Sequence, residues 1–311
     1  MLENSNDIDR WPEKFDVILL NPPFSKDLHF LKKASSLSKG IVLSVQPSSF
    51  LIDKKGKSKI YRETKKTIQD KIQSLIFFNG NGIFNIGLYV PCSIILVDKN
   101  NSSPHFSFVD LQTSKKSRVK REDLDFISIF GYSLPFITFS RKIKDFLESN
   151  KSLHDFSNLK KKNKNLSKDC YYVEFTHFSG RGHRGNHLLM SDPILKDDFF
   201  TLISRNQLEV KNGKSGDPLK YKIWFEFETR EEGENFITYL TSNFSRACLS
   251  TTKVHQNLEN GDLKSVPWMN FKEKCNDEIL FGSLGLEKNE IEFIKSGIPA
   301  YYKNFPKPNP H

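Results

Sequence analysis

The sequence predicts an α/β protein with an open sheet in its first part and a mixed α+β arrangement in its second part. Over residues 1–150, short apolar runs alternate with segments whose apolar residues recur at helical spacing, which is the pattern of a sheet with crossover helices. Residues 151–168 are rich in Lys and Asn, and the run 160–164 holds no apolar side chain. We therefore expect a basic linker at 151–168 and a second domain at 169–311.

The elements of the first domain follow from apolar periodicity. Strands are expected at 15–20, 40–51, 75–78, 89–97 and 106–111, and helices at 28–38, 67–72 and 139–147. The basic stretch 53–66 is expected to be a loop, and Asn79-Gly80-Asn81-Gly82 a turn. This order predicts a sheet that closes with an antiparallel edge.

The elements of the second domain are fewer. Strands are expected at 170–178 and 224–227, and helices at 230–249 and 287–294. Between the two strands lies a glycine-rich loop at 180–187. These elements predict a small mixed α+β domain with a helical tail.

Composition limits the class of protein. With 37% hydrophobic and 27% charged residues, a chain of 311 residues has the balance of a soluble globular protein and room for two domains. No run approaches the ~18 apolar residues of a membrane span, and residues 1–11 do not form a signal peptide, so we expect no membrane contact and a cytoplasmic location. The four cysteines never adopt Cys-x-x-Cys spacing, which indicates reduced thiols and no zinc site.

The net charge of +10 favours a polyanionic partner such as nucleic acid. Lys55 and Lys57 belong to the basic stretch 53–66. This stretch is either a solvated surface or a rim that faces phosphates, and the sequence leaves both interpretations open.

The stretch Phe15-Asp16-Val17-Ile18-Leu19-Leu20 reads as a buried strand that ends abruptly on Asn21-Pro22-Pro23-Phe24. The two prolines forbid helix and remove two backbone donors. An amide side chain and unpaired carbonyls are then presented at the carboxyl end of a strand, where open α/β sheets bind their ligands. A plain strand-ending turn is the simpler interpretation of Asn-Pro-Pro.

The apolar strand followed by Asn21-Pro22-Pro23-Phe24 resembles the catalytic motif of adenine-specific (N6) DNA methyltransferases of restriction–modification type, including type II and IIG enzymes. The resemblance extends to the stretch 87–99, Gly-x-x-x-Pro-x-Ser-Ile-Ile-Leu-Val-Asp-Lys. It implies a partial Rossmann-like methyltransferase sheet, its second half, in residues 1–150, followed by a mixed α+β target recognition domain in residues 169–311. It also implies S-adenosyl-L-methionine as cofactor and double-stranded DNA as partner.

The resemblance implies a role for each residue of the motif. Asn21 and the Pro22 carbonyl accept the two hydrogens of a flipped adenine amine, Pro23 stiffens the turn, and Phe24 stacks on the base. Catalysis then comes from positioning rather than from a strong base.

The glycine-rich loop that holds the cofactor in this family is missing before the motif, because the 20 residues that precede Asn21 contain no glycine. A circular permutation would place this loop at 280–285, where the glycine spacing is poor. The chain is therefore expected to begin in mid-sheet and to need a second polypeptide, or an upstream segment, that carries the cofactor-binding half. Its cofactor-binding residues are unknown.

The loop 180–187 is the expected DNA contact, through Arg181, His183, Arg184 and Asn186. Its simpler interpretation is a solvated turn. The His183-x-x-x-His187 pair lacks a Cys or a nearby acidic partner, so no metal site is expected.

Two other functions fit the same residues. The chain could be a catalytically inactive DNA-binding specificity module, or a split subunit of such an enzyme. The motif could also serve a methyltransferase that acts on RNA or protein.

Overall fold

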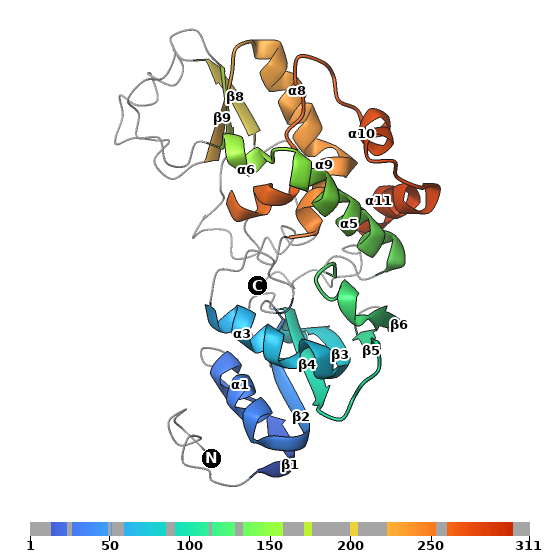
Figure 1. The fold of residues 1–311 in the computed structure, drawn as a ribbon. Helices are drawn as coiled ribbons and strands as arrows, with labels where there is room; N and C mark the ends of the chain where they lie inside the picture. Colours follow the sequence, from blue (N-terminus) through green and yellow to red (C-terminus); the bar gives the residue numbers. More distant parts are fainter. Residues whose placement is uncertain are drawn as a thin grey trace, which may run out of the picture. The chain divides into compact units, whose positions relative to one another are not determined.

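The computed structural model describes residues 14–23, 27–48, 51, 59–84, 91–111, 114–127, 133–157, 171–175, 200–204, 223–252 and 260–300. The chain forms two compact units, Met1–Ile129 and Phe130–His311, whose elements are labelled in Figure 1. The expected domain boundary lay between 150 and 169, whereas the compact units meet at 129/130.

The first unit is built on a six-stranded sheet with the order β1-β2-β4-β3-β5-β6. Its strands are β1 (Phe15–Leu20), β2 (Ser38–Pro47), β3 (Ile72–Asn79), β4 (Pro91–Asp98), β5 (His105–Asp110) and β6 (Lys115–Lys120). Its helices are α1 (Asp27–Leu37), α3 (Lys59–Ile68) and α4 (Gly80–Phe84), with short 3-10 turns η2 (Gln69–Lys71) and η3 (Arg121–Asp123). The predicted α/β class is confirmed.

The sheet is mixed, and its antiparallel strands lie in two places. β1 pairs parallel with β2, and β3 pairs parallel with β5. β4 runs antiparallel to both β2 and β3, and β6 runs antiparallel to β5 at the edge. The predicted antiparallel edge is therefore present as β6, and a second antiparallel strand lies inside the sheet.

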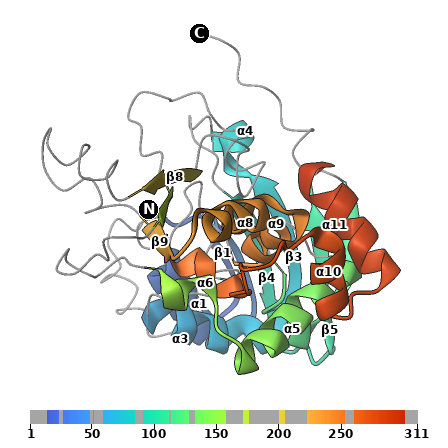
Figure 2. The same cartoon turned by 90° about the horizontal axis from the view of Figure 1, so that it is seen from above.

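One face of this sheet is packed against helices. α1 connects β1 to β2, packs on both strands, and buries Leu28, Phe30 and Leu31. The alternate residues Val42, Ser44 and Gln46 of β2 are completely buried. Figure 2 shows α1 and α3 together on one side of the strands and α4 on the other side.

β1 and β2 approach closely at Gly40. A Cβ atom at this position would lie 2.9 Å from the carbonyl oxygen of Asp16, which is backbone and cannot give way. Glycine at position 40 therefore allows the two parallel strands to pair where β2 begins.

Several expectations for the first unit need correction. The first strand was expected to be buried, but β1 is an edge strand whose Phe15, Val17 and Leu19 are exposed. The stretch 59–66 was expected to be loop, but it belongs to α3, which buries Thr64 and Ile68. The predicted helix 67–72 is the end of α3 followed by η2, and the predicted turn at 79–82 lies mostly in α4.

The second unit combines a small sheet with a helical layer. The sheet has the order β8-β7-β9 and is antiparallel throughout. Its strands are β7 (Tyr171–Phe175), β8 (Phe200–Ser204) and β9 (Ile223–Phe227). The helical elements are α5 (Leu134–Ser149), α6 (Leu153–Phe156), α8 (Arg230–Thr241), α9 (Asn243–Ser250), η5 (Asn260–Ser265), α10 (Asp277–Ser283) and α11 (Lys288–Ala300).

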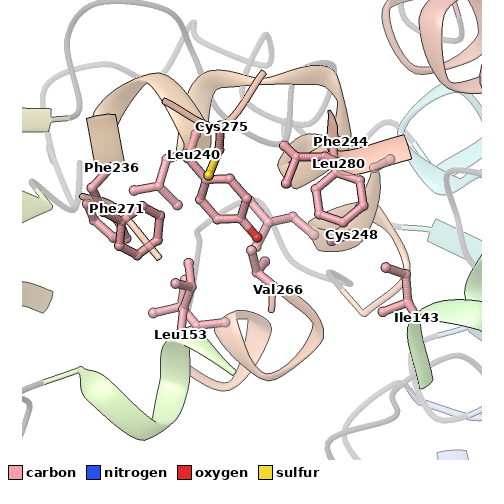
Figure 3. Packing of buried hydrophobic residues seen from close by; sticks show 14 of the residues in the cluster. Ile143, Leu153, Phe236, Leu240, Phe244, Cys248, Val266, Phe271, Cys275 and Leu280 are labelled. Atoms are coloured by element: carbon pink, nitrogen blue, oxygen red, sulfur yellow. The ribbon is translucent and has the colours of Figure 1, made fainter. Parts of the chain in front are cut away.

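The core of the second unit is aromatic. Phe236, Tyr239 and Phe244 are each 0% exposed, and the ring of Phe236 lies 5.0 Å from that of Phe271. The phenol of Tyr239 donates a hydrogen bond of 2.6 Å to the Pro267 carbonyl, which satisfies its hydroxyl inside the core. Figure 3 shows this packing.

Two expectations for the second unit also need correction. The helix expected at 139–147 is α5, and Phe139 and Ile143 pack into the second unit's core rather than into the first domain. The helix expected at 230–249 is broken at Ser242, which is extended and whose hydroxyl caps the first turn of α9 by accepting from the Ser245 N–H.

Candidate active site at the ends of β1 and β2

The motif Asn21-Pro22-Pro23 follows β1 directly and has no regular secondary structure. Asn21 and Pro23 are exposed, and Pro22 is buried. The prolines stop the strand because neither can donate to a ladder or turn into helix here. Asn21 is thus held at the carboxyl end of β1 by a stiff turn, with one proline anchored in the protein.

The ends of β1 and β2 lie side by side. The last register pair of the two strands is Leu20 with Ser44, and β2 continues to Pro47. Because the strands are parallel, their carboxyl ends meet at one edge of the sheet, which is the ligand-binding edge of open α/β sheets. Asn21-Pro22, which follow β1, and Gln46-Pro47-Ser48, at the end of β2, therefore lie at the same edge of the sheet.

Beside the motif lies a buried polar cluster that the sequence analysis did not select. Gln46 and Ser44 are 0% exposed, and the Ser44 hydroxyl donates to Gln46 Oε1 at 3.3 Å. Gln46 pairs in register with Ser93 of β4. The Gln46 amide nitrogen and the hydroxyls of Ser48 and Ser93 find no hydrogen-bond partner among the described residues.

Buried donors and acceptors are normally paired, and residues 24–26 and 49–50, which follow the two strands, lie outside the described part of the chain. The sequence feature that could have indicated this polar cluster is Gln46-Pro47-Ser48. These residues end an apolar run abruptly, as Asn21-Pro22-Pro23 does after the first strand. Only the strand pairing shows that this ending and Ser93 come together.

Burial raises the pKa of two titratable groups near the ends of these strands. Burial raises the pKa of the Cys92 thiol, which lies opposite Pro47, to about 11, so it stays protonated at neutral pH. Burial also raises the pKa of Asp27, although the Leu28 N–H donates to its carboxylate at 2.8 Å. At this edge the exposed Asn21 side chain offers an amide oxygen that can accept hydrogen bonds from a ligand.

The remaining predicted site residues lie outside the described part of the chain. They are Phe24, Lys55, Lys57, Arg181, His183, Arg184 and Asn186. Among the described residues, no group of three His, Cys, Asp or Glu side chains could hold a metal ion. None of the helices in the described ranges combines the length and apolarity that a bilayer crossing requires.

Comparison with known proteins gives structural similarity only. No family model matches the chain, and no curated protein matches its sequence. The methyltransferase subunit of a type I restriction–modification system from Streptococcus thermophilus aligns at 14% identity with a TM-score of 0.27, over 68% of this chain and 39% of that subunit. A chain from a type I restriction–modification complex aligns at 16% identity and a TM-score of 0.28, over 46% of this chain and 32% of that one.

The type IIG restriction endonuclease BpuSI aligns over 94% of this chain at 13% identity and a TM-score of 0.31. This chain covers 50% of BpuSI, so it spans half or less of the length of each of these three structures. All three TM-scores lie below 0.5, and the function proposed below therefore rests on this chain's own residues.

Proposed function

We propose that this chain is the base-binding part of a site-specific DNA adenine-N6 methyltransferase of a restriction–modification system. The observation that supports the proposal is the position of Asn21-Pro22-Pro23 at the carboxyl end of a parallel strand, beside the polar ending of the next strand. That edge is where α/β proteins bind their ligands, and the exposed amide is the group that the chemistry needs.

Methylation of adenine requires the exocyclic amine to be held outside the DNA stack. The Asn21 side-chain oxygen and the Pro22 carbonyl accept the two amine hydrogens, which keeps the nitrogen lone pair from delocalising into the ring. Phe24 offers a π-face for the flipped base, worth roughly 1–3 kcal/mol. Gln46 and Ser93 are buried beside the end of β2 and support this edge of the sheet from within.

S-adenosyl-L-methionine is the methyl donor that the proposed reaction uses, but the described residues do not form a binding site for it. β1 is the edge of the sheet, and no described strand lies on its free side. A strand followed by a glycine-rich loop and a helix is what a nucleotide-like cofactor needs. The cofactor-binding residues therefore belong to another polypeptide or to a segment other than those described.

The proposed partners are double-stranded DNA and this cofactor-binding half. The net charge of +10 supports contact with phosphates, and the loop with Arg181 and Arg184 is proposed to reach the duplex. The second unit is proposed to act as the target recognition domain.

The proposal is tested by the product. The chain is co-expressed with the polypeptide encoded directly upstream, in a host whose DNA lacks modified bases, and genomic DNA is hydrolysed for nucleoside mass spectrometry. We expect N6-methyladenine, and none with Asn21→Ala. Methylated cytosine, or Asn21-dependent methyl groups only in RNA or protein, would overturn the assignment. If the chain retards duplex DNA in a gel but no modified base is found, the catalytically inactive DNA-binding specificity module is the function that remains.

A further inference from the structure

One lysine of α3 joins three segments of the first unit. The Lys65 side chain is 17% exposed, and its ammonium donates a hydrogen bond of 3.0 Å to the Leu51 carbonyl and a second one to the Asp125 carboxylate. Leu51 follows β2, and Asp125 follows η3. The next residue of the helix, Lys66, is exposed and makes no such contact among the described residues. Lys65 is therefore set apart from its neighbour by what it binds.

The segment after β2 turns at the ligand-binding edge of the sheet. β1 ends level with Ser44, whereas β2 runs on to Pro47, which lies about 10 Å further along the strand. Ser48 is buried, and its carbonyl accepts a hydrogen bond from the Leu51 N–H at 3.0 Å. The turn from Ser48 to Leu51 therefore begins beyond the level of Asn21, at the edge where Asn21 presents its amide.

Two different forces hold Leu51. Its side chain is 2% exposed, and burial of an apolar side chain fixes how deep it lies but not how its peptide group is turned. A hydrogen bond has a preferred direction, so the Lys65 ammonium fixes the orientation of the Leu51 carbonyl. A hydrogen bond from a charged donor is also stronger than a neutral one. Without Lys65, the burial of Leu51 would remain, but the orientation of the turn would be less closely fixed.

The ammonium is itself held from another side by Asp125. This carboxylate is 69% exposed, so it is the solvent-facing partner of the pair. Its neighbours Leu124 and Ile127 are at most 3% exposed, which fixes the backbone that carries it. A lysine has a flexible stem and three donors that rotate freely. The carboxylate therefore limits the directions in which the Lys65 ammonium can donate.

The attachment of α3 to the rest of the unit does not depend on Lys65. Thr64 and Ile68 of the same helix are 0% exposed, and Lys32 of α1 binds Glu63 at 2.6 Å. These contacts already fix the helix. What Lys65 adds is the hydrogen bond to the turn after β2.

We propose that Lys65 is a positioning residue for the site at the ends of β1 and β2. It acts through the peptide group of Leu51, fixes the turn that follows β2, and so holds the backbone at the edge where Asn21 binds its ligand. Asp125 holds the ammonium in the orientation that this requires. The role rests on the proposed function of Asn21, whereas the hydrogen bonds rest on the structure alone.

The test measures methyl transfer to unmodified genomic DNA by this chain, co-expressed with the polypeptide encoded directly upstream. Lys65→Met should lower kcat at least about tenfold and leave the KM for DNA within about twofold, because small displacements at a site reduce its rate steeply. Lys65→Arg keeps a charged donor and should recover most of the rate. The matched control is Lys66→Met, which removes the same charge from an exposed position of the same helix and should keep kcat.

A second variant and a second measurement cover the case that Lys65→Met fails to fold. Asp125 is mostly exposed, so Asp125→Asn should fold, and it should lower kcat about two- to fivefold, as the loss of an exposed ion pair does. Hydrogen exchange of the full 311-residue chain reports on the turn directly. The Leu51 amide should exchange faster in Lys65→Met and Asp125→Asn than in Lys66→Met.

The positioning role and the proposed function fail in different ways. An unchanged kcat in Lys65→Met, or in Asp125→Asn where Lys65→Met does not fold, overturns the positioning role. A raised KM with an unchanged kcat also overturns it, because Lys65 would then bind DNA. A wild-type complex that forms no N6-methyladenine removes the proposed function and the role of Lys65 with it, whereas an active wild type with an unaffected Lys65→Met removes the positioning role alone.

Discussion

The two units of the chain complete their hydrophobic cores in different ways. The second unit encloses Phe236, Tyr239 and Phe244 between its sheet and its helices, and pairs the one phenol of that group with a carbonyl. The first unit packs one face of its sheet against α1 and leaves Val17 and Leu19 exposed on the other. The described residues of the second unit thus enclose an aromatic core, whereas those of the first unit leave an apolar sheet edge exposed.

This difference bears on where the proposed base-binding site lies. The site residue Asn21 lies in the first unit, directly after the strand that has a free edge. A ligand crevice in an open α/β sheet needs strands on both sides. The proposed ligand crevice therefore lies at the exposed apolar edge of β1.

The largest effect is expected in the closed core. Phe236→Ala removes a completely buried ring that touches Phe225, Phe227 and Phe271, and should lower the free energy of unfolding by about 3–5 kcal/mol. Hydrogen exchange of α8 and α9 peptides measures this loss. A loss below about 1 kcal/mol would show that the core is loosely packed.

A smaller effect is expected at the start of α9. Asp277 accepts hydrogen bonds from the Phe244 N–H at 3.0 Å and from the Asn243 side chain at 2.9 Å. A carboxylate at a helix N-terminus satisfies free N–H groups and complements the helix dipole. Asp277→Ala should cost about 1–2 kcal/mol in urea unfolding, and its exposed neighbour Glu278→Ala should cost a few tenths.

The ion pair between α5 and α11 gives a pH-dependent test. Burial by itself raises the pKa of Glu290, but Lys142 Nζ at 2.7 Å and the Glu287 N–H at 2.6 Å donate to its carboxylate, and the net pKa lies below its usual value. A lowered pKa stabilises the folded state above the unfolded pKa, and this contribution is lost as the pH falls through the folded pKa.

Glu290→Gln should therefore cost about 1–2 kcal/mol at pH 7, since Lys142 is left without its anion at a partly exposed position. The difference from wild type should shrink as the pH falls through the lowered pKa of Glu290, where its carboxylate takes up a proton. Urea midpoints measured from pH 3 to pH 7 give the profile. A difference that stays constant with pH would contradict the lowered pKa.

The smallest effect is expected at the open edge. Leu19→Ala should change the stability of the isolated chain by less than about 0.5 kcal/mol, because its side chain is 71% exposed. Leu31→Ala, at a 0% exposed position on α1 in the same unit, should cost about 2–5 kcal/mol. Thermal unfolding compares the two variants, and similar losses would show that β1 is covered in solution.

The sequence predicted the local elements that its periodicity encodes. The strand Phe15–Leu20 and the helix Asp27–Leu37 were placed within a residue or so, because an apolar run and an abrupt Asn-Pro-Pro ending leave few alternatives. β4 was found for the same reason, as a continuous apolar run bounded by polar residues.

Features that depend on tertiary partners were not predictable. α3 carries too many lysines to look helical from composition, yet Lys32 binds Glu63 across α1 and α3 at 2.6 Å and Thr64 is buried. Ser242 breaks a continuous apolar period because its hydroxyl caps the next helix. Gln46 became a site candidate only once strand pairing brought it beside Ser93.

The most direct test of the central claim is the single-turnover rate of methyl transfer to duplex DNA by the reconstituted complex, with Asn21→Ala beside wild type. Asn21 is exposed, so the variant should fold and bind DNA normally. We predict a rate at least about 100-fold lower with unchanged DNA affinity, the loss typical of one missing hydrogen bond to a reacting group. An unchanged rate would contradict the assignment of Asn21 as the acceptor of the adenine amine.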